Sequence, residues 1–221
     1  MGLGDELLAA GQAKLLGGKV AIYHKGKPVR NELYRFIPYL SPNGRRYEEA
    51  PYRRYISSIE RNPKRVRFNH DYRPEPAGIR IDPLENDYVI IEPTVKREAS
   101  PAKQWHHYQE VVDALPYKFL QFRYQTLSGV DSVKTSLYEA ARLMAGCRFY
   151  VGTEGFLHHL AAALGKPAVV IIGAYSPPEV IGYPFHINLS VDDPEELGSF
   201  TKTGAMERIS PDMVIEACRS I

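Results

Sequence analysis

The sequence predicts an α/β protein whose larger part is a doubly wound, parallel β-sheet. Strand-like and helix-like segments alternate from residue 87 to the C-terminus, which is typical of helices packed on both faces of a parallel sheet. The strand-like segments are short, uninterrupted apolar runs such as AVVIIG (168–173), as expected of strands buried on both sides. Ligands of such sheets bind beyond the carboxyl ends of the strands, so functional residues are expected there.

The elements of this half follow from their composition and their end signals. We expect strands at residues 87–93, 117–123, 148–152, 168–173 and 186–191. We expect helices at residues 103–115, 136–147, 155–165 and 210–221. Gly165 and Pro167 end the third helix, and the last helix begins at an N-cap serine, Ser210, followed by Pro211.

The first half is less regular. Gly2 and Gly4 form a turn in front of a helix that begins with Asp5 and Glu6. Further short elements are expected as a strand at 19–25, a helix at 31–40 and strands at 65–70 and 78–82. Proline and acidic residues mark a boundary near 82–87. The sequence therefore predicts a reduced N-terminal α/β domain at 1–85 and a C-terminal domain at 86–221.

The composition is that of an ordinary globular protein, with 44% hydrophobic and 24% charged residues in a chain of 221. No run approaches the roughly 18 apolar residues of a membrane span, and the N-terminus lacks the basic and apolar segments of a signal peptide. The two cysteines, Cys147 and Cys218, fit neither a disulfide framework nor a zinc site. We therefore expect a cytoplasmic protein.

The charge is unevenly distributed along the chain. Residues 1–80 contain 16 Lys and Arg against 8 Asp and Glu, a net charge of +8, and the remaining residues carry −6. Basic residues alternate with aromatic ones over residues 45–73. This stretch is either a solvated face with half-buried tyrosines or a docking surface for an anionic acceptor such as a phosphorylated lipid, an acidic glycan or a nucleic acid.

Three places carry candidate functional residues. In VGTEGFLHHLAAALGKP (151–167) a strand ends, turns at glycine and enters a helix, which presents free backbone N–H groups to a phosphate. The loop after strand 87–93 offers hydroxyls and cations for the same anion, namely Thr94, Lys96, Arg97, Ser100 and Lys103. Asp5, after two glycines, is either a general base or a helix cap. The alternatives are that the glycines only let the chain turn and that the loop is merely polar.

Four segments, taken in order, resemble the GT-B glycosyltransferases typified by the bacterial ADP-heptose:lipopolysaccharide heptosyltransferases. They are GLGDELLAA (2–10), EPTVKREASPAKQW (92–105), SLYEAARLMAGCRFYVGTEGFLHHLAAALGKPAVVIIG (136–173) and AMERISPDMVIEA (205–217). The third segment is long and the most specific. The resemblance implies a GT-B-like fold, in which residues 86–221 form a Rossmann-like domain that binds a nucleotide sugar.

The resemblance also implies roles for particular residues. Asp5 matches the family's catalytic base, which deprotonates the acceptor hydroxyl. The positions that match the donor-binding groups are Thr94, Lys103, Thr153, Glu154, Gly155, Phe156 and His159. A helix N-terminus, a lysine and a histidine would neutralise a departing nucleoside diphosphate without a metal ion. We therefore expect no cofactor and no metal, and inversion at the anomeric carbon by a single displacement.

The sequence departs from the family pattern at the donor site. Glu154 replaces an aspartate, which moves the carboxylate outward by one methylene group, and Gly155-Phe156 replaces Thr-Gly. Ala205 stands where the family often has cysteine. The sugar or the nucleotide is therefore expected to differ from ADP-heptose.

The leading hypothesis is an inverting, metal-independent glycosyltransferase that moves a sugar from a nucleotide-sugar donor to an anionic acceptor, which is a glycan, a lipid or a nucleic acid. One alternative is a catalytically inactive protein that binds a nucleotide or nucleotide sugar. Another is a nucleic-acid-modifying glycosyltransferase that uses the basic, Tyr- and Arg-rich stretch. A short N-terminal half also raises the expectation of a homo-oligomer.

Overall fold

The computed structural model describes residues 2–48, 55–61, 64–84, 87–95 and 101–221. A six-stranded sheet forms its centre, in the order β11-β10-β9-β6-β7-β8 and with every neighbouring pair parallel. The strands are β6 (Val89–Glu92), β7 (Phe119–Phe122), β8 (Asp131–Val133), β9 (Tyr150–Thr153), β10 (Ala168–Gly173) and β11 (Ile187–Ser190). The predicted parallel α/β sheet is therefore confirmed.

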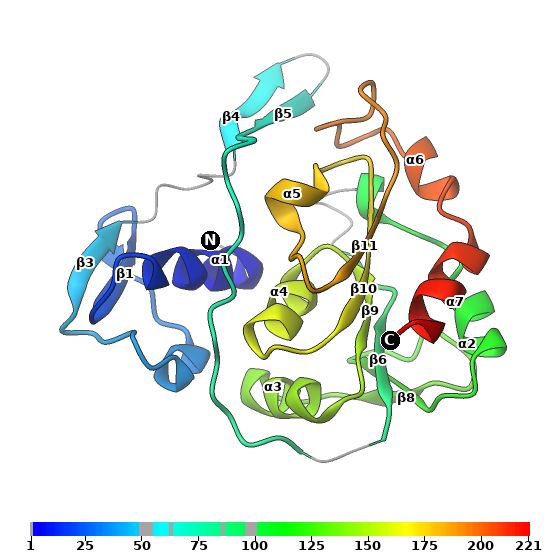
Figure 1. Cartoon of the computed structure of the whole chain (residues 1–221), viewed down its shortest axis with the longest axis horizontal. Coiled ribbons are helices and arrows are strands. Elements are labelled where there is room, and N and C mark those ends of the chain that lie inside the picture. The colour runs from blue at the N-terminus through cyan, green and yellow to red at the C-terminus, as the bar shows by residue number, and fades with distance from the viewer. Residues whose placement is uncertain (1, 49–54, 62–63, 85–86, 96–100) are drawn as a thin grey trace.

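Helices cover both faces of this sheet (Figure 1). On one face lie α3 (Leu137–Gly146) and α4 (Phe156–Ala163), and on the other lie α2 (Tyr108–Ala114) and α7 (Pro211–Arg219). The short helices α5 (Pro178–Ile181) and α6 (Gly204–Glu207) complete this half. Neighbouring strand residues enter opposite cores: Ile90 packs with α3 and α4, whereas Val89 and Ile91 pack with α2 and α7. Burial on both faces explains the uninterrupted apolar runs.

The first half is built around a smaller sheet, in the order β2-β1-β3. β1 runs parallel to β3 and antiparallel to β2. The elements are α1 (Leu3–Lys14), β1 (Val20–His24), β2 (Lys27–Pro28), the 3-10 helix η1 (Glu32–Phe36) and β3 (Arg45–Glu48). They are followed by an antiparallel pair of strands, β4 (Tyr55–Arg61) and β5 (Lys64–Phe68). The 3-10 helix η2 (Pro101–Lys103) comes later in the chain, after β6.

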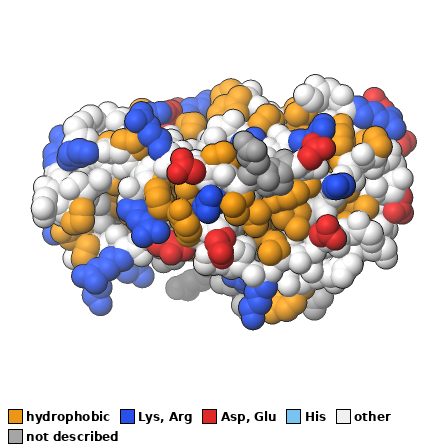
Figure 2. All heavy atoms as spheres, turned by 90° about the horizontal axis from the view of Figure 1, so that it is seen from below, with side chains coloured by type: hydrophobic (Ala, Val, Ile, Leu, Met, Phe, Trp, Pro, Cys, Tyr) orange, Lys and Arg blue, Asp and Glu red, His pale blue; other side chains and the backbone are white. Residues whose placement is uncertain are grey.

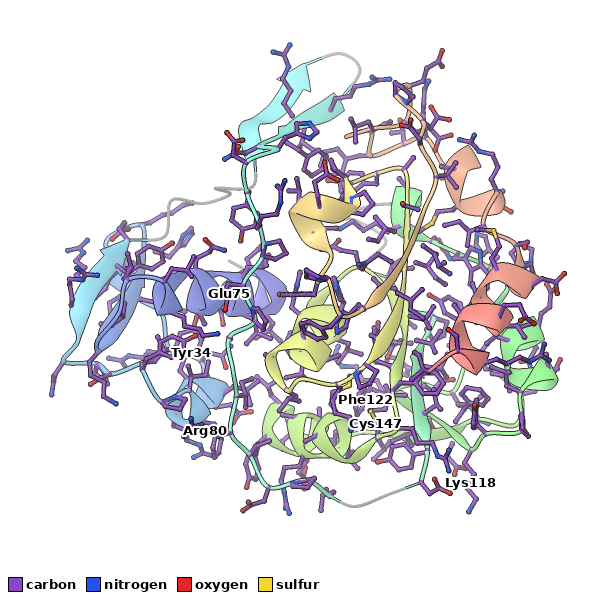
Figure 3. The ribbon with its side chains drawn as sticks, in the orientation of Figure 1. Tyr34, Glu75, Arg80, Lys118, Phe122 and Cys147 are labelled. Carbon is purple, nitrogen blue, oxygen red and sulfur yellow. The ribbon has the colours of Figure 1, made fainter. Side chains whose placement is uncertain are left out.

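Helix α1 joins the first half to the central sheet. Its side chains Leu7 and Leu8 are buried in the same core as Met144 of α3 and Leu160 of α4, and α1 and α4 lie side by side in Figure 1. In Figure 3, Phe122 and Cys147 mark this core between the sheet and α3. The core is therefore continuous across the expected boundary, and the division into two domains stays a prediction.

The segment that follows β5 holds α1 from the other side. Glu75, labelled in Figure 3, lies against α1, and its carboxylate forms an ion pair with Lys14 at 2.5 Å. A Cβ atom on Gly11 would stand 1.7 Å from the backbone oxygen of Glu75. Only a glycine allows this approach, so the position of α1 is fixed on two sides.

Two expected elements are shorter than the sequence predicted. The helix predicted at 103–115 begins only at Tyr108, because Trp105 is buried and its indole N–H donates to the carbonyl oxygen of Ile209 at 2.8 Å. The helix predicted at 31–40 is limited to η1 at Glu32–Phe36, and Asn31 caps its start by accepting from the N–H of Leu33.

The strand predicted at 78–82 is wrong. The backbone N–H of Ile79 donates to the carbonyl oxygen of Ala163 at 2.7 Å, and that of Arg80 donates to Phe36 at 2.8 Å. The segment therefore bridges α4 and η1 instead of joining a sheet. The strand predicted at 65–70 is confirmed as β5, at Lys64–Phe68.

The surface agrees with the uneven charge of the sequence. Figure 2 shows one face of the molecule, and Lys and Arg side chains are spread over its left-hand end, where the first half of the chain lies. Among the helices of the described residues, none combines the length and apolar character that a membrane crossing requires. The expected cytoplasmic location stays a prediction.

Candidate functional site

The site predicted from the sequence lies at the carboxyl edge of the central sheet, where β6 and β9 end side by side. Their register pairs Glu92, the last residue of β6, with Gly152. A Cβ atom on Gly152 would stand 2.1 Å from the phenolic oxygen of Tyr150 and 3.2 Å from the carbonyl oxygen of Glu92. A glycine is therefore required at the point where the chain leaves the sheet.

The chain then turns through Thr153 and Glu154, both buried, into helix α4. The N-cap of α4 is Gly155, and the helix begins at Phe156, which is half-buried. The first N–H groups of a helix have no partner within it and, together with the helix dipole, attract an anion. No described atom lies within 4 Å of a Cβ built on Gly155, so there is space beside this turn.

Glu154 connects two of the predicted donor-binding residues. Its Oε2 atom accepts a hydrogen bond from the ammonium group of Lys103, and its Oε1 atom lies 3.4 Å from Nε2 of His159. The side chain of Glu154 is 5% exposed, that of His159 1% and that of Lys103 20%. The three residues come from the β9–α4 turn, from α4 and from η2, and they form one buried polar cluster.

Two tyrosines hold this cluster in place. The ammonium group of Lys103 lies 4.9 Å from the ring centroid of Tyr175, within the range of a cation–π contact. Nδ1 of His159 lies 3.1 Å from the hydroxyl oxygen of Tyr183, which fixes the orientation of the imidazole ring. Both tyrosines are buried. The lysine and the histidine are thus positioned before any ligand binds.

Helix α1 brings Asp5 to the same place. A Cβ atom on Gly4 would stand 3.2 Å from Cδ2 of His159 and 3.4 Å from the backbone of Phe156, so the start of α1 touches the start of α4. Asp5 is the next residue, and one of its carboxylate oxygens accepts from the backbone N–H of Gly2 at 3.3 Å. Asp5 therefore lies inside the first turn of α1 and serves as a cap beside the site.

Thr94 lies just beyond β6 and is exposed. Its hydroxyl and its backbone N–H, the latter at 3.0 Å, both donate to Oε1 of Glu92. Burial raises the pKa of the Glu92 carboxyl group, although the hydrogen bonds from Thr94 oppose the shift. Thr94 thus reaches the carboxyl edge as predicted, where it is engaged with a buried acid.

A second layer of histidines supports α4. His158 is fully buried between His159, Tyr183 and His186, with ring centroids 4.8 to 5.3 Å apart. Neither ring nitrogen of His158 has a hydrogen-bond partner within the described part of the chain. Burial lowers the pKa of His158 well below its ordinary value, and it lowers the pKa of His186 to about 4. Both rings are therefore neutral near pH 7.

The structure brings most of the predicted site residues together. Lys103, Glu154 and His159 are in contact, Gly155 and Phe156 form the adjoining turn, and Asp5 follows a residue that touches His159. Thr153 is buried at the end of β9. The loop cations Lys96 and Arg97, together with Ser100, lie outside the described residues. The roles assigned to these residues stay predictions.

Three residues of the site, which lie outside the cluster, are not predicted by the sequence. Glu92 ends a strand-like run, and an acid at the end of an apolar run in a parallel sheet is a signal for the carboxyl edge. Tyr175 and Tyr183 lie in a stretch without periodicity, so nothing in the sequence marked them. Over the described residues, no group of three or more His, Cys, Asp or Glu side chains is arranged to hold a metal ion. The expected metal independence stays a prediction.

Residues 130–208, which include β9, the turn and α4, match the model of glycosyltransferase family 9 (heptosyltransferase). The resemblance inferred from the motifs is confirmed over this range, which contains the most specific of the four segments (136–173) and with it Glu154 and His159. No curated protein sequence matches the chain.

One solved heptosyltransferase structure shares the fold, and two further glycosyltransferase structures are less similar. The dodecameric iron-containing heptosyltransferase TibC of enterotoxigenic E. coli, in complex with ADP-D-beta-D-heptose, is 18% identical, with a TM-score of 0.54 over 80% of this chain and 59% of that one. The E. coli ADP-heptose lps heptosyltransferase II is 19% identical, with a TM-score of 0.49 over 65% of this chain and 53% of that one. A family 9 glycosyltransferase from Veillonella parvula is 22% identical, with a TM-score of 0.47 over 61% of this chain and 45% of that one.

The match to TibC supports the GT-B-like fold of the parallel sheet and its helices. The chain corresponds to only about half of the length of the solved heptosyltransferases, from 45% to 59% in these three cases. The bound ADP-D-beta-D-heptose and the dodecameric assembly are properties of TibC.

Proposed function

We propose that the chain is a glycosyltransferase that transfers a sugar from a nucleotide-sugar donor. The observation that carries this proposal is the contact between the N-termini of α1 and α4. At this contact Gly4 lies against His159, which belongs to the cluster with Lys103 and Glu154 at the carboxyl edge of the sheet, and Asp5 is the next residue of α1. We propose that Asp5 serves the acceptor and that Lys103 serves the donor.

The proposed donor site binds the diphosphate of the nucleotide sugar. The N–H groups of the first turn of α4 and the ammonium group of Lys103 would stabilise the charge that develops as the nucleoside diphosphate departs. Positioned donors of this kind need no metal ion, because the positive charge is supplied by the chain itself. His159, fixed by Tyr183, would donate to a phosphate oxygen through Nε2.

The proposed base is Asp5. A carboxylate at the start of α1 can accept the proton of an acceptor hydroxyl as its oxygen attacks the anomeric carbon. The attack would come from the side of α1, and the diphosphate would leave toward α4. A single displacement of this geometry inverts the configuration of the anomeric carbon.

The acceptor is proposed to bind on the first half, which is rich in Lys and Arg. A cavity of about 560 Å³ lies beside β1 and η1, within the usual size range of small-molecule pockets. Asn31 and Tyr34 line it and also bind Glu6: the Asn31 amide donates to the Glu6 carboxylate at 2.7 Å, and the Tyr34 hydroxyl donates to the Glu6 carbonyl at 2.9 Å. Glu6 follows Asp5 directly, so these two hydrogen bonds connect the wall of the cavity to the residue next to the proposed base.

The charge of residues 1–80 favours an anionic acceptor. Arg30, Glu32 and Arg35 are the charged residues of the otherwise largely apolar wall of the cavity, and two positive charges against one negative charge leave it net positive. An acidic glycan or a phosphorylated lipid headgroup fits this combination.

The test is an assay for release of the nucleoside diphosphate from ADP-, UDP- and GDP-sugars, in the presence of EDTA and of anionic glycan or phospholipid acceptors. We expect release from one class of donor that depends on the acceptor and persists in EDTA. Tight binding of a nucleotide sugar with no release would support the alternative of a binding protein. Neither binding nor release would contradict both.

A further inference from the structure

Glu154 occupies the place in the cluster where an anionic ligand is expected. Its two carboxylate oxygens face two different groups: Oε2 accepts from the ammonium group of Lys103, and Oε1 lies 3.4 Å from Nε2 of His159. These are the two side chains that the proposed donor site uses to hold the diphosphate. A carboxylate and a phosphate group present the same pair of acceptor oxygens to such donors.

Burial explains why the cluster needs an anion of its own. The ammonium group of Lys103 is largely enclosed, with its side chain 20% exposed and Tyr175 across one side. A largely buried cation without a counter-charge is strongly unfavourable. Glu154, 5% exposed, supplies that charge in the absence of a ligand.

A diphosphate changes this balance. If it approached the N-terminus of α4 while Glu154 kept its place, the carboxylate and the phosphate oxygens would be neighbouring like charges in a poorly solvated site. Such a pair is repulsive. The diphosphate therefore has to take over Lys103 and His159 from the carboxylate, and Glu154 has to move aside or bind a proton.

We propose that Glu154 is the residue that sets the affinity of this site for a diphosphate, acting as an internal anion that competes with the ligand for Lys103 and His159. This inference rests on the proposed donor site. It distinguishes Glu154 from a residue that merely contacts the sugar, because it predicts that loss of its charge strengthens anion binding instead of weakening it.

The test is titration calorimetry of the full chain with inorganic pyrophosphate, comparing the unsubstituted protein with Glu154→Gln and Glu154→Asp. Glu154→Gln keeps the size of the side chain and removes the charge, so we expect it to bind pyrophosphate at least tenfold more tightly. Glu154→Asp keeps the charge and is expected to gain much less. Equal or weaker binding by Glu154→Gln would overturn the proposal.

A second neutral variant keeps the test decisive. If thermal unfolding shows that Glu154→Gln is not folded, Glu154→Thr is measured in its place, because it also lacks the charge and its hydroxyl oxygen can still accept a hydrogen bond. The same tenfold gain is expected, and its absence would overturn the proposal.

A parallel titration with ADP, UDP and GDP separates this inference from the proposed function. Nucleotide binding with equal pyrophosphate affinities in all variants would overturn the role of Glu154 and leave the proposed function standing. A pyrophosphate gain in Glu154→Gln with no nucleotide binding in any variant would support the role of Glu154 and contradict the nucleotide-sugar proposal. Failure of every ligand in every variant would overturn both.

Discussion

Gly4 touches His159: a Cβ atom placed on Gly4 would stand 3.2 Å from Cδ2 of the imidazole ring. This contact joins the start of α1 to the start of α4, although the two residues are far apart in the sequence. Because Asp5 follows Gly4 and because Glu154 faces His159, the contact sets the distance between the proposed base and the proposed donor site.

Gly4→Val is expected to force the two helices apart. A Cβ atom alone already lies 3.4 Å from the backbone of Phe156, and the two further methyl groups would overfill the contact. Overpacking of this kind costs about 1–3 kcal/mol of unfolding free energy, and we expect transfer activity to fall with it. Chemical denaturation and the release assay measure the two effects.

Gly155→Ala is the matched control for that variant. Gly155 directly precedes Phe156, but its backbone is extended and a Cβ atom there meets open space. We expect its stability to stay within about 0.5 kcal/mol of the unsubstituted protein. If Gly4→Val behaved like Gly155→Ala, the approach of α1 to α4 would not matter for the protein.

Asp5→Asn is expected to abolish transfer and to leave donor binding intact. The amide cannot accept the acceptor proton, yet it can still accept the hydrogen bond from the backbone of Gly2 that caps α1. The release assay and nucleotide titration separate the two outcomes. Glu6→Gln, one residue further along the helix, serves as the control and is expected to retain transfer. Turnover by Asp5→Asn would remove Asp5 from the mechanism.

Lys103→Ala is expected to weaken the affinity for a nucleoside diphosphate by at least tenfold. The substitution removes a charge-assisted hydrogen bond to the ligand, which is worth about 1.5–3 kcal/mol, and leaves the negative charge of Glu154 unopposed. Lys118→Ala is the control, because Lys118 is exposed just before β7, at the opposite edge of the sheet (Figure 3). An unchanged affinity in Lys103→Ala would exclude this lysine from the donor site.

The buried histidines predict a loss of stability in mild acid. The pKa of His186 is about 4 in the folded protein against an ordinary value of 6.5, so the unfolded chain binds an additional proton between these values. Stability is therefore complete above about pH 6.5 and declines as the pH falls toward 4. Between pH 7.5 and pH 5.0 the loss that His186 contributes is about 2 kcal/mol. Urea unfolding at pH 7.5 and pH 5.0 measures it.

His158→Phe tests the origin of this loss. Phenylalanine keeps a ring in the buried position and takes up no proton, so the variant is expected to lose less stability in acid than the unsubstituted protein. His107→Asn is the control: hydrogen bonding to Glu110 raises the pKa of the half-buried His107, which therefore stabilises the folded state at low pH. Removing His107 should not reduce the loss in acid. Identical pH dependence in His158→Phe would show that another group is responsible.

Much of the fold follows from local patterns. The apolar run 168–173 is strand β10, and Ser210 caps α7 by accepting from the backbone N–H of Met213. These elements could be predicted because a strand buried on both faces and a helix with its cap leave signals within a few residues.

The remaining elements depend on distant contacts. β3 has the sequence RRYE, which carries no strand pattern, and it forms because it pairs with β1 along Arg45–Glu48. Residues 104–107 are not helical because Trp105 binds the backbone of Ile209, which lies between α6 and α7, far away in the sequence. A tertiary contact of this kind overrides local helix propensity and has no signature in the segment itself.

The site also combines residues that a local sequence pattern predicts with residues that only distant contacts bring together. The turn and helix at 153–159 could be found from the sequence because a glycine turn between a buried strand and a helix has a local pattern. Tyr175 and Tyr183 could not, since they reach Lys103 and His159 only through the packing of the loops after β10. The ion pair of Lys103 with Glu154 was equally hidden, because it joins residues from two separate segments.

The most direct test of the central claim is a thermal-shift panel of nucleoside diphosphates and nucleotide sugars, first without metal and then with magnesium. A ligand that binds only the folded protein stabilises it by about 2.7 kcal/mol at a hundredfold excess over its dissociation constant. We predict a shift with one nucleoside diphosphate and its sugars, unchanged by magnesium and clearly reduced in Lys103→Ala. The absence of a shift with every member of the panel would contradict the account.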